Sequence, residues 1–214
     1  MSRLPHLGWS SNVYPLEAAD VAALADYEGA DIPDEALPKD DIILLIRPDG
    51  PDVLLRGRTR LHVACSESET PLVVPVRIVF KPSIAIWNLL ATLFRPLRNL
   101  YRYQGTGIYH IDVHAVRDLG VERAVRTLDN VGRGHERKMT KLYTSLREQG
   151  YNEAKPINVM LCRTGGSKDS LRNGHHRISA CLELGVSRMT IHFSAAGALP
   201  RCFWKPLGMG GGRS

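Results

Sequence analysis

The chain has 214 residues, of which 43% are hydrophobic and 23% are charged, and its formal net charge is +6. This composition excludes a disordered chain, and the length indicates one large domain or one domain with an additional region. The basic balance predicts an anionic partner, such as a nucleotide, nucleic acid, acidic lipid or anionic glycan, without choosing among them.

Residues 1–104 are predicted to form an N-terminal region with a small antiparallel sheet. Leu16, Val21 and Leu24 share a helical face, which predicts a short helix within residues 15–27. Further on, short runs rich in aliphatic and β-branched residues are separated by Gly, Ser, Glu and Pro. Such runs predict three or four strands, over residues 42–46, 53–55, 60–64 and 72–80. The arginines at 56, 58 and 60 are expected on a solvated face.

Residues 82–103 form a separate segment, which we predict to be an apolar helix. Positions 83–94 are almost wholly apolar, and Arg95, Arg98 and Arg102 follow them. The apolar run is too short to span a bilayer, which takes about 20 residues, so a buried helix is the first interpretation. The alternative is a helix that lies on a membrane surface, because Trp87 and its apolar neighbours stand beside arginines.

The N-terminus lacks the charged and apolar sequence typical of a signal peptide, so we expect a cytoplasmic protein, with contact to the inner face of the membrane as the alternative. The cysteines at 65, 162, 181 and 202 are widely spaced and contain no CxxC pair, so they are expected to be reduced. Cys162 and Cys181 fall on patterns typical of buried residues.

Residues 105–194 show a more regular pattern and are predicted to form a second domain, followed by a flexible tail over 195–214. Alternation predicts strands at 108–113, 157–161 and 189–193. Helical faces are predicted at 121–128, at 139–146 before Gly150, and at 178–182 before Gly185. Residues 163–173 are predicted to be a polar loop. The expected class of the whole chain is α+β.

The start of the last helix carries the strongest functional signal. Gly174, His175, His176 and Arg177 crowd its first turn, directly after Asn173. Backbone N–H groups are unpaired at a helix N-terminus and carry the positive end of the helix dipole, so added imidazole and guanidinium groups make an anion site. Arginine binds phosphate in bidentate fashion, which makes phosphate the expected anion.

Two other patterns were weighed for a ligand role. Gly165, Gly166, Ser167 and Lys168 have the composition of a phosphate loop without the Walker spacing, so Lys168 alone is kept as a candidate phosphate contact. A second pattern, His110, Asp112 and His114, would share one side of a strand with a spacing suitable for metal ligands. A solvated polar side is the preferred interpretation, and no protein-held metal is predicted.

Residues 109–193 resemble the ParB/sulfiredoxin fold. The resemblance is carried by Ser145-Leu146-Arg147-Glu148-Gln149-Gly150, Pro156-Ile157-Asn158-Val159 and Asn173-Gly174-His175-His176-Arg177. Sulfiredoxins have a cysteine at the position of His175, which speaks against their redox activity here. ParB partition proteins continue into a helix-turn-helix domain, for which the residues after Phe193 are too few.

The ParB-like free serine kinases look most similar, since they show His-Glu upstream and Gly-His-His-Arg at the helix start. The resemblance implies a kinase in which Glu136 is the general base and His175 takes part in catalysis. His176 and Arg177 would hold the phosphates of ATP or ADP, with CTP as the alternative, and Mg²⁺ would accompany the nucleotide. Asn173 replaces the family aspartate, and Asp169 could take its place only if the loop folds back.

The expected function is therefore a nucleotide-dependent kinase that phosphorylates a hydroxyl group of a small molecule or glycan intermediate. A non-enzymatic ATP- or CTP-binding switch is one alternative. A ParB-like nucleic-acid-binding protein is another, which the missing helix-turn-helix domain makes the less favoured of the two.

Overall fold

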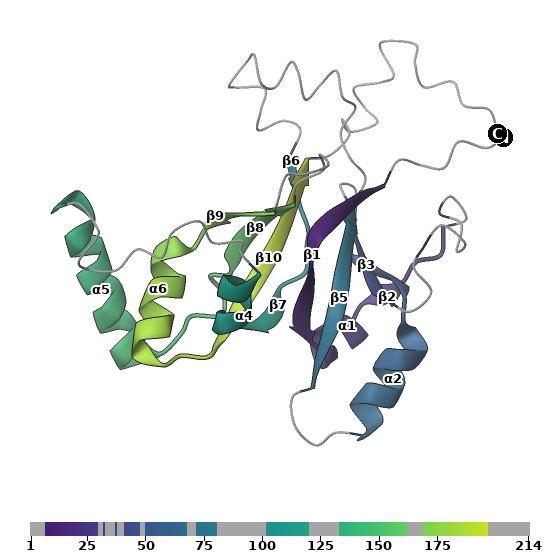
Figure 1. The fold of residues 1–214 in the computed structure, drawn as a ribbon, viewed down its shortest axis with the longest axis horizontal. Helices are drawn as coiled ribbons and strands as arrows, with labels where there is room; N and C mark the ends of the chain where they lie inside the picture. The colour runs from purple at the N-terminus through teal and green to yellow at the C-terminus, as the bar shows by residue number, and fades with distance from the viewer. Residues whose placement is uncertain are drawn as a thin grey trace, which may run out of the picture.

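A computed structural model of the chain describes residues 7–29, 32, 37, 41–47, 50–67, 72–80, 102–119, 133–161 and 169–196 (Figure 1). In these residues ten strands form one mixed sheet, in the order β2-β4-β3-β5-β1-β7-β10-β8-β9, and β6 pairs with the end of β10. The strands are β1 (Gly8–Glu17), β2 (Ala25–Asp26), β3 (Ile42–Ile46), β4 (Val53–Arg56), β5 (Val73–Phe80), β6 (Arg102–Gln104), β7 (Tyr109–Asp112), β8 (Ile157–Leu161), β9 (Ser170–Asn173) and β10 (Arg188–Ala196). The helices are α1 (Ala18–Ala22), α2 (Arg58–Glu67), α4 (Val113–Asp118), α5 (Arg133–Gln149) and α6 (His175–Leu184).

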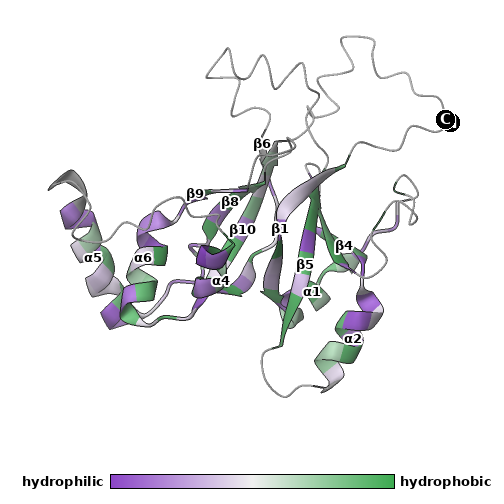
Figure 2. Cartoon of the chain, viewed as in Figure 1, coloured by the Kyte–Doolittle hydropathy of each residue, from purple (hydrophilic) through white to green (hydrophobic). Residues whose placement is uncertain are grey.

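The main core forms where alternate strand residues meet the apolar sides of the helices. Tyr14 of β1 and Phe193 of β10 are fully buried, and their rings meet edge to face with centroids 4.8 Å apart. Met139 of α5 and Ile178 of α6 belong to the same core. Figure 2 shows the pattern: the strands are mostly apolar, while α5 combines apolar and hydrophilic residues. The described chain is therefore a mixed α/β structure.

The N-terminal strands do not form the antiparallel sheet that we predicted. β3 runs parallel to β5, whereas β4 is antiparallel to β3 and β1 is antiparallel to β5. The strand at 42–46 is buried along its whole length, as expected of a strand covered on both sides. The runs at 53–55 and 72–80 are strands as predicted, so the error lies in how the strands pair.

One predicted element of this region is wrong in type. Residues 60–64 belong to helix α2, not to a strand; Leu61 is buried there while Val63 is 47% exposed. The preceding Gly57 has φ +106°, which turns the chain out of β4. The short helix expected within 15–27 is present as α1, which begins only at Ala18 because β1 continues through Pro15, opposite Pro75, as far as Glu17.

The sheet continues across the boundary predicted at residue 104. Leu16 of β1 pairs with Ile111 of β7, and β6 from the N-terminal region pairs with β10. In addition, Asp169, next to the edge strand β9, accepts hydrogen bonds from Ser11 and Tyr14 of β1. Strands from both predicted regions thus share one sheet.

The later part of the chain follows the predicted order of elements, with three corrections. Helix α4 was not predicted, and residues 195–196, expected in the flexible tail, end strand β10. Helices α5 and α6 and strands β8 and β10 form where the periodicity placed them. Residues 170–173, expected in a loop, form edge strand β9 antiparallel to β8, with only Leu171 of the four buried. The segment 82–101, the helix expected at 121–128 and the tail from 197 lie outside the described residues.

Cys181 is buried as predicted, and burial raises the pKa of its thiol to about 11. Cys65 is exposed on α2, and Cys162 and Cys202 lie outside the described residues. No helix in the described ranges is long and apolar enough to cross a membrane.

Candidate functional site

Gly174 sets the start of helix α6. Its φ of +115° is in the left-handed region, and a Cβ at this position would lie 2.4 Å from Cγ2 of Ile157 on β8. Glycine therefore meets two requirements here, a backbone conformation and a close approach between the helix start and the sheet. Gly174 is also the N-cap residue, and no side chain caps the helix.

The first turn of α6 presents the predicted cationic residues in a half-buried position. Ile178 N–H closes the first helical bond to Gly174 O, so the N–H groups of His175, His176 and Arg177 precede the regular helical bonds. His175, His176 and Arg177 are half-buried. Nη1 of Arg177 is enclosed and has no hydrogen-bond partner in the part of the chain that the structure describes. A buried guanidinium N–H without an acceptor is costly, which favours an anionic ligand.

Arg177 also lines a pocket between α5 and α6. The pocket has a volume of about 280 Å³, and both polar and apolar residues line it. The lining consists of Leu142, Ser145, Leu146, Gln149, Gly150, Tyr151, Asn152, Lys155 and Arg177. The lining contains two cations, two amides and two hydroxyl groups, and no carboxylate. Such a set of groups suits a small anionic ligand.

Among the predicted site residues that the structure describes, Arg177 alone lines this pocket. Glu136 is exposed in the first turn of α5, and its carboxylate makes no hydrogen bond or ion pair to the start of α6 within the described residues. Along a helix with a rise of 1.5 Å per residue, Glu136 is about 9 Å from Leu142, the first residue of the pocket. Asn173 is exposed at the end of β9, and Lys168 lies outside the described residues.

Asp169 does not take the place of the family aspartate. It is 2% exposed, and its carboxylate accepts from Tyr14 Oη at 2.7 Å and from Ser11 N at 3.1 Å. Its own backbone N–H donates to Ser11 Oγ at 2.7 Å. These contacts make Asp169 a structural link between β9 and β1.

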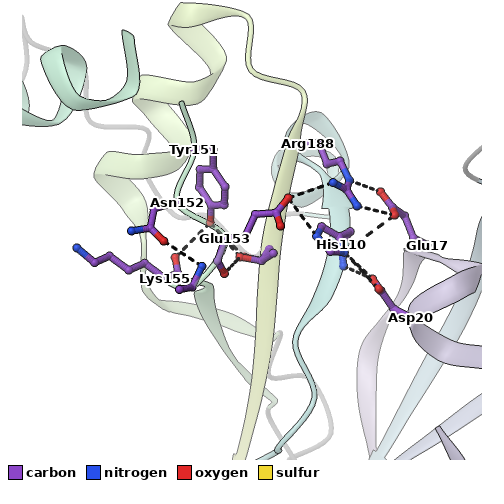
Figure 3. A network of polar contacts seen from close by, with 10 residues as sticks. Glu17, Asp20, His110, Tyr151, Asn152, Glu153, Lys155 and Arg188 are labelled. Carbon is purple, nitrogen blue, oxygen red and sulfur yellow. Dashed lines mark hydrogen bonds and ion pairs between the residues drawn. The ribbon is translucent and has the colours of Figure 1, made fainter. Parts of the chain in front are cut away.

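A second polar cluster was not predicted from the sequence (Figure 3). Asp20 of α1 accepts from His110 N at 2.5 Å, and its Oδ2 lies 3.0 Å from His110 Nδ1. Arg188 holds Glu17 in bidentate fashion, with Nε–Oε1 at 2.6 Å and Nη2–Oε2 at 3.0 Å. Glu153 lies 3.0 Å from Arg188 Nη1 and 3.4 Å from His110 Nε2. The five residues join the end of β1 to β7, β10 and the 151–155 turn.

This cluster is better explained as an ion-pair network than as a metal centre. Ligand atoms of Glu17, Asp20 and His110 lie within 4.8 Å of one another, a spacing that a metal ion could bridge. However, both carboxylate oxygens of Glu17 already pair with Arg188, and this pairing lowers the pKa of Glu17 and raises that of Arg188. The alternative set of His110, Asp112 and His114 does not share a strand side, because Asp112 caps α4 and His114 lies in that helix.

No family model matches the sequence, and no curated protein or solved structure matches it either.

Proposed function

We propose that this protein binds the phosphates of a nucleotide between α5 and α6 and transfers a phosphoryl group to a hydroxyl of a small molecule or glycan intermediate. The observation that carries the proposal is the environment of Arg177. Its enclosed Nη1 has no acceptor within the described residues, it belongs to an uncapped helix start, and it lines a pocket that also contains Lys155.

Phosphoryl transfer asks mainly for positioning and for positive charge around the phosphate oxygens. Arg177 can supply two parallel N–H donors, and Lys155 makes no ion pair in the described ranges, so both charges are available to a ligand. The pocket lining contains no carboxylate, so Mg²⁺ would arrive with the nucleotide phosphates. The resemblance to the ParB-like serine kinases supports ATP or ADP as the nucleotide.

In this proposal the hydroxyl oxygen of the acceptor forms a bond to the terminal phosphorus of the nucleotide, and Glu136 accepts the hydroxyl proton. The bond from that phosphorus to the bridging oxygen breaks, and the nucleotide leaves with one phosphate fewer. His175 and His176 would orient the terminal phosphate at the helix start. For this, the nucleotide must extend along the α5–α6 groove, because Glu136 precedes the pocket by about two helical turns.

Arg177→Ala tests the binding step. We expect nucleotide affinity, measured by isothermal titration calorimetry, to fall about tenfold to hundredfold, since a charge-assisted hydrogen bond contributes about 1.5–3 kcal/mol. Arg117→Ala is the matched control: it removes one exposed arginine from α4, outside the pocket, and should leave affinity unchanged. Equal affinity of Arg177→Ala and wild type would overturn the proposed site.

The transfer step is tested by phosphorus NMR with ATP, ADP or CTP and a panel of hydroxyl acceptors. Glu136→Gln should keep nucleotide affinity and lose transfer. If the wild-type protein consumes no nucleotide with any acceptor, the proposed kinase activity is contradicted.

A nucleotide-binding switch without catalysis is the second candidate. It is favoured by the exposed position of Glu136, whose carboxylate has no described partner that would hold it toward the pocket. In that case Arg177→Ala would weaken binding as above, and Glu136→Gln would change neither binding nor nucleotide turnover.

A further inference from the structure

The turn at residues 151–155 contacts both the pocket and the ion-pair network. Tyr151, Asn152 and Lys155 line the pocket that contains Arg177. Glu153, in the middle of the same turn, points away from them toward Arg188 and His110, as Figure 3 shows. One short segment therefore connects the pocket to the ion-pair network.

Neutral hydrogen bonds hold the turn against β10. Tyr151 Oη donates to Lys155 O at 3.2 Å and lies 3.4 Å from Thr190 O. Thr190 Oγ1 donates to Glu153 O at 3.0 Å, and Lys155 N donates to Asn152 O at 3.0 Å. These bonds fix the two ends of the turn and the backbone carbonyl of Glu153.

The charged contacts add a second anchor at Glu153, through its side chain. Glu153 Oε1 lies 3.0 Å from Arg188 Nη1, and Arg188 is itself fixed by the bidentate contact with Glu17 at the end of β1. The side chains of Glu153 and Arg188 are 57% and 52% exposed, and exposed ion pairs contribute little to stability. Loss of this pair is therefore expected to leave the fold intact.

We infer that Glu153 and Arg188 are positioning residues for the anion bound in the pocket. By anchoring the 151–155 turn, they keep Lys155 and Asn152 in the lining of the pocket that Arg177 also lines. The inference rests on the proposed function, because it takes the ligand to be a phosphate group. It assigns the ion-pair network a role in ligand affinity in addition to its place between β1, β7 and β10.

Removal of Glu153 should change anion affinity in opposite directions, depending on whether the residue acts through its charge or by anchoring the turn. If the carboxylate acted only through its charge, Glu153→Ala would remove a negative charge near a cationic pocket and tighten anion binding. If it anchors the turn, the same change releases Lys155 and Asn152 and weakens binding. The sign of the change in affinity therefore decides between the two.

The experiment measures the affinity of the full chain for inorganic pyrophosphate and for ATP by calorimetry, beside thermal melting. We expect Glu153→Ala and Arg188→Ala to weaken binding about threefold to tenfold, with melting temperatures close to that of the wild type. Glu148→Ala is the matched control, because it removes an exposed glutamate from α5 next to the pocket residue Gln149 without touching the turn. If Glu153→Ala fails to fold, Glu153→Gln gives the same comparison with the side-chain volume retained.

Unchanged or tighter binding by Glu153→Ala, with a wild type that binds pyrophosphate, would overturn this inference and leave the proposed function standing. A wild type that binds none of the probes would overturn the proposed function, and the inference with it.

Discussion

At the scale of single residues, Glu17 shows how position changes the chemistry of a side chain. It ends β1, is 14% exposed, and accepts both hydrogen bonds of the Arg188 guanidinium. The bond to Arg188 stabilises the ionised carboxylate more than burial disfavours it, so the pKa of Glu17 lies below its ordinary value of 4.5. In the unfolded chain this partner is lost.

The shift predicts an acid-dependent part of the stability. Because the folded pKa is lower than the unfolded one, the contribution of Glu17 is complete above pH 4.5 and disappears as the pH falls through the folded pKa. We expect the free energy of unfolding of Glu17→Gln, measured by urea denaturation, to fall less steeply below pH 4.5 than that of the wild type. Glu148→Gln should keep the wild-type slope, and identical slopes for wild type and Glu17→Gln would refute the assignment.

At the scale of elements, the β9–α6 junction determines where the candidate site can form. Residues 170–173 pair with β8, Gly174 turns the chain, and α6 begins against Ile157. The uncapped first turn of α6 is thereby held beside the sheet, with Arg177 directed into the pocket.

Gly174→Ala should disrupt this junction. The left-handed φ costs about 1–2 kcal/mol for a residue with a Cβ. Contact with Ile157 at 2.4 Å adds overpacking of about 1–3 kcal/mol. We therefore expect chemical denaturation to show a loss of about 2–5 kcal/mol. Gly185→Ala is the control, since φ is +72° there but nothing lies within 4 Å of the added Cβ, and about 1 kcal/mol is expected. Equal losses at the two glycines would show that the contact with Ile157 is relieved.

At the scale of the whole molecule, three aspartates join the N-terminal half of the sheet to the C-terminal half. Asp20 accepts from His110, and Asp169 accepts from Tyr14. Asp52 accepts from the backbone of Thr106 and Gly107 and from Tyr109 Oη at 2.8 Å. The main core also contains residues of both halves. We therefore expect the described sheet to unfold as one unit.

Asp169→Ala tests whether the two halves of the sheet unfold together. It removes the buried hydrogen bond from Tyr14 Oη to the Asp169 carboxylate, and the loss of such a bond costs about 1–3 kcal/mol. The loss should appear to the same extent in far-ultraviolet circular dichroism and in tryptophan fluorescence. Asp118→Ala, at the exposed end of α4, should leave the midpoint unchanged. Separate midpoints for the two probes would instead indicate two independently unfolding domains, as a boundary near residue 104 would allow.

Much of the second half of the fold could be predicted from the sequence alone. The burial of Met139, Tyr143 and Leu146 on α5 and of Cys181 on α6 follows from helical periodicity, which depends on neighbours three or four residues apart. Gly185, the left-handed residue that ends α6, was also predicted from the local pattern. The sequence also predicted Arg177 as a candidate anion contact, because it directly follows two histidines at a helix start.

The tertiary structure alone decided the rest. Residues 60–64 became a helix, and β3 paired in parallel with β5, because burial against distant strands outweighs local preference. The pairs Glu17–Arg188 and Asp20–His110 join residues 171 and 90 positions apart. The pocket likewise forms only where α6 meets the end of α5 and the 151–155 turn. Local sequence patterns cannot predict such contacts. The fold brings these residues together, although they are far apart along the chain.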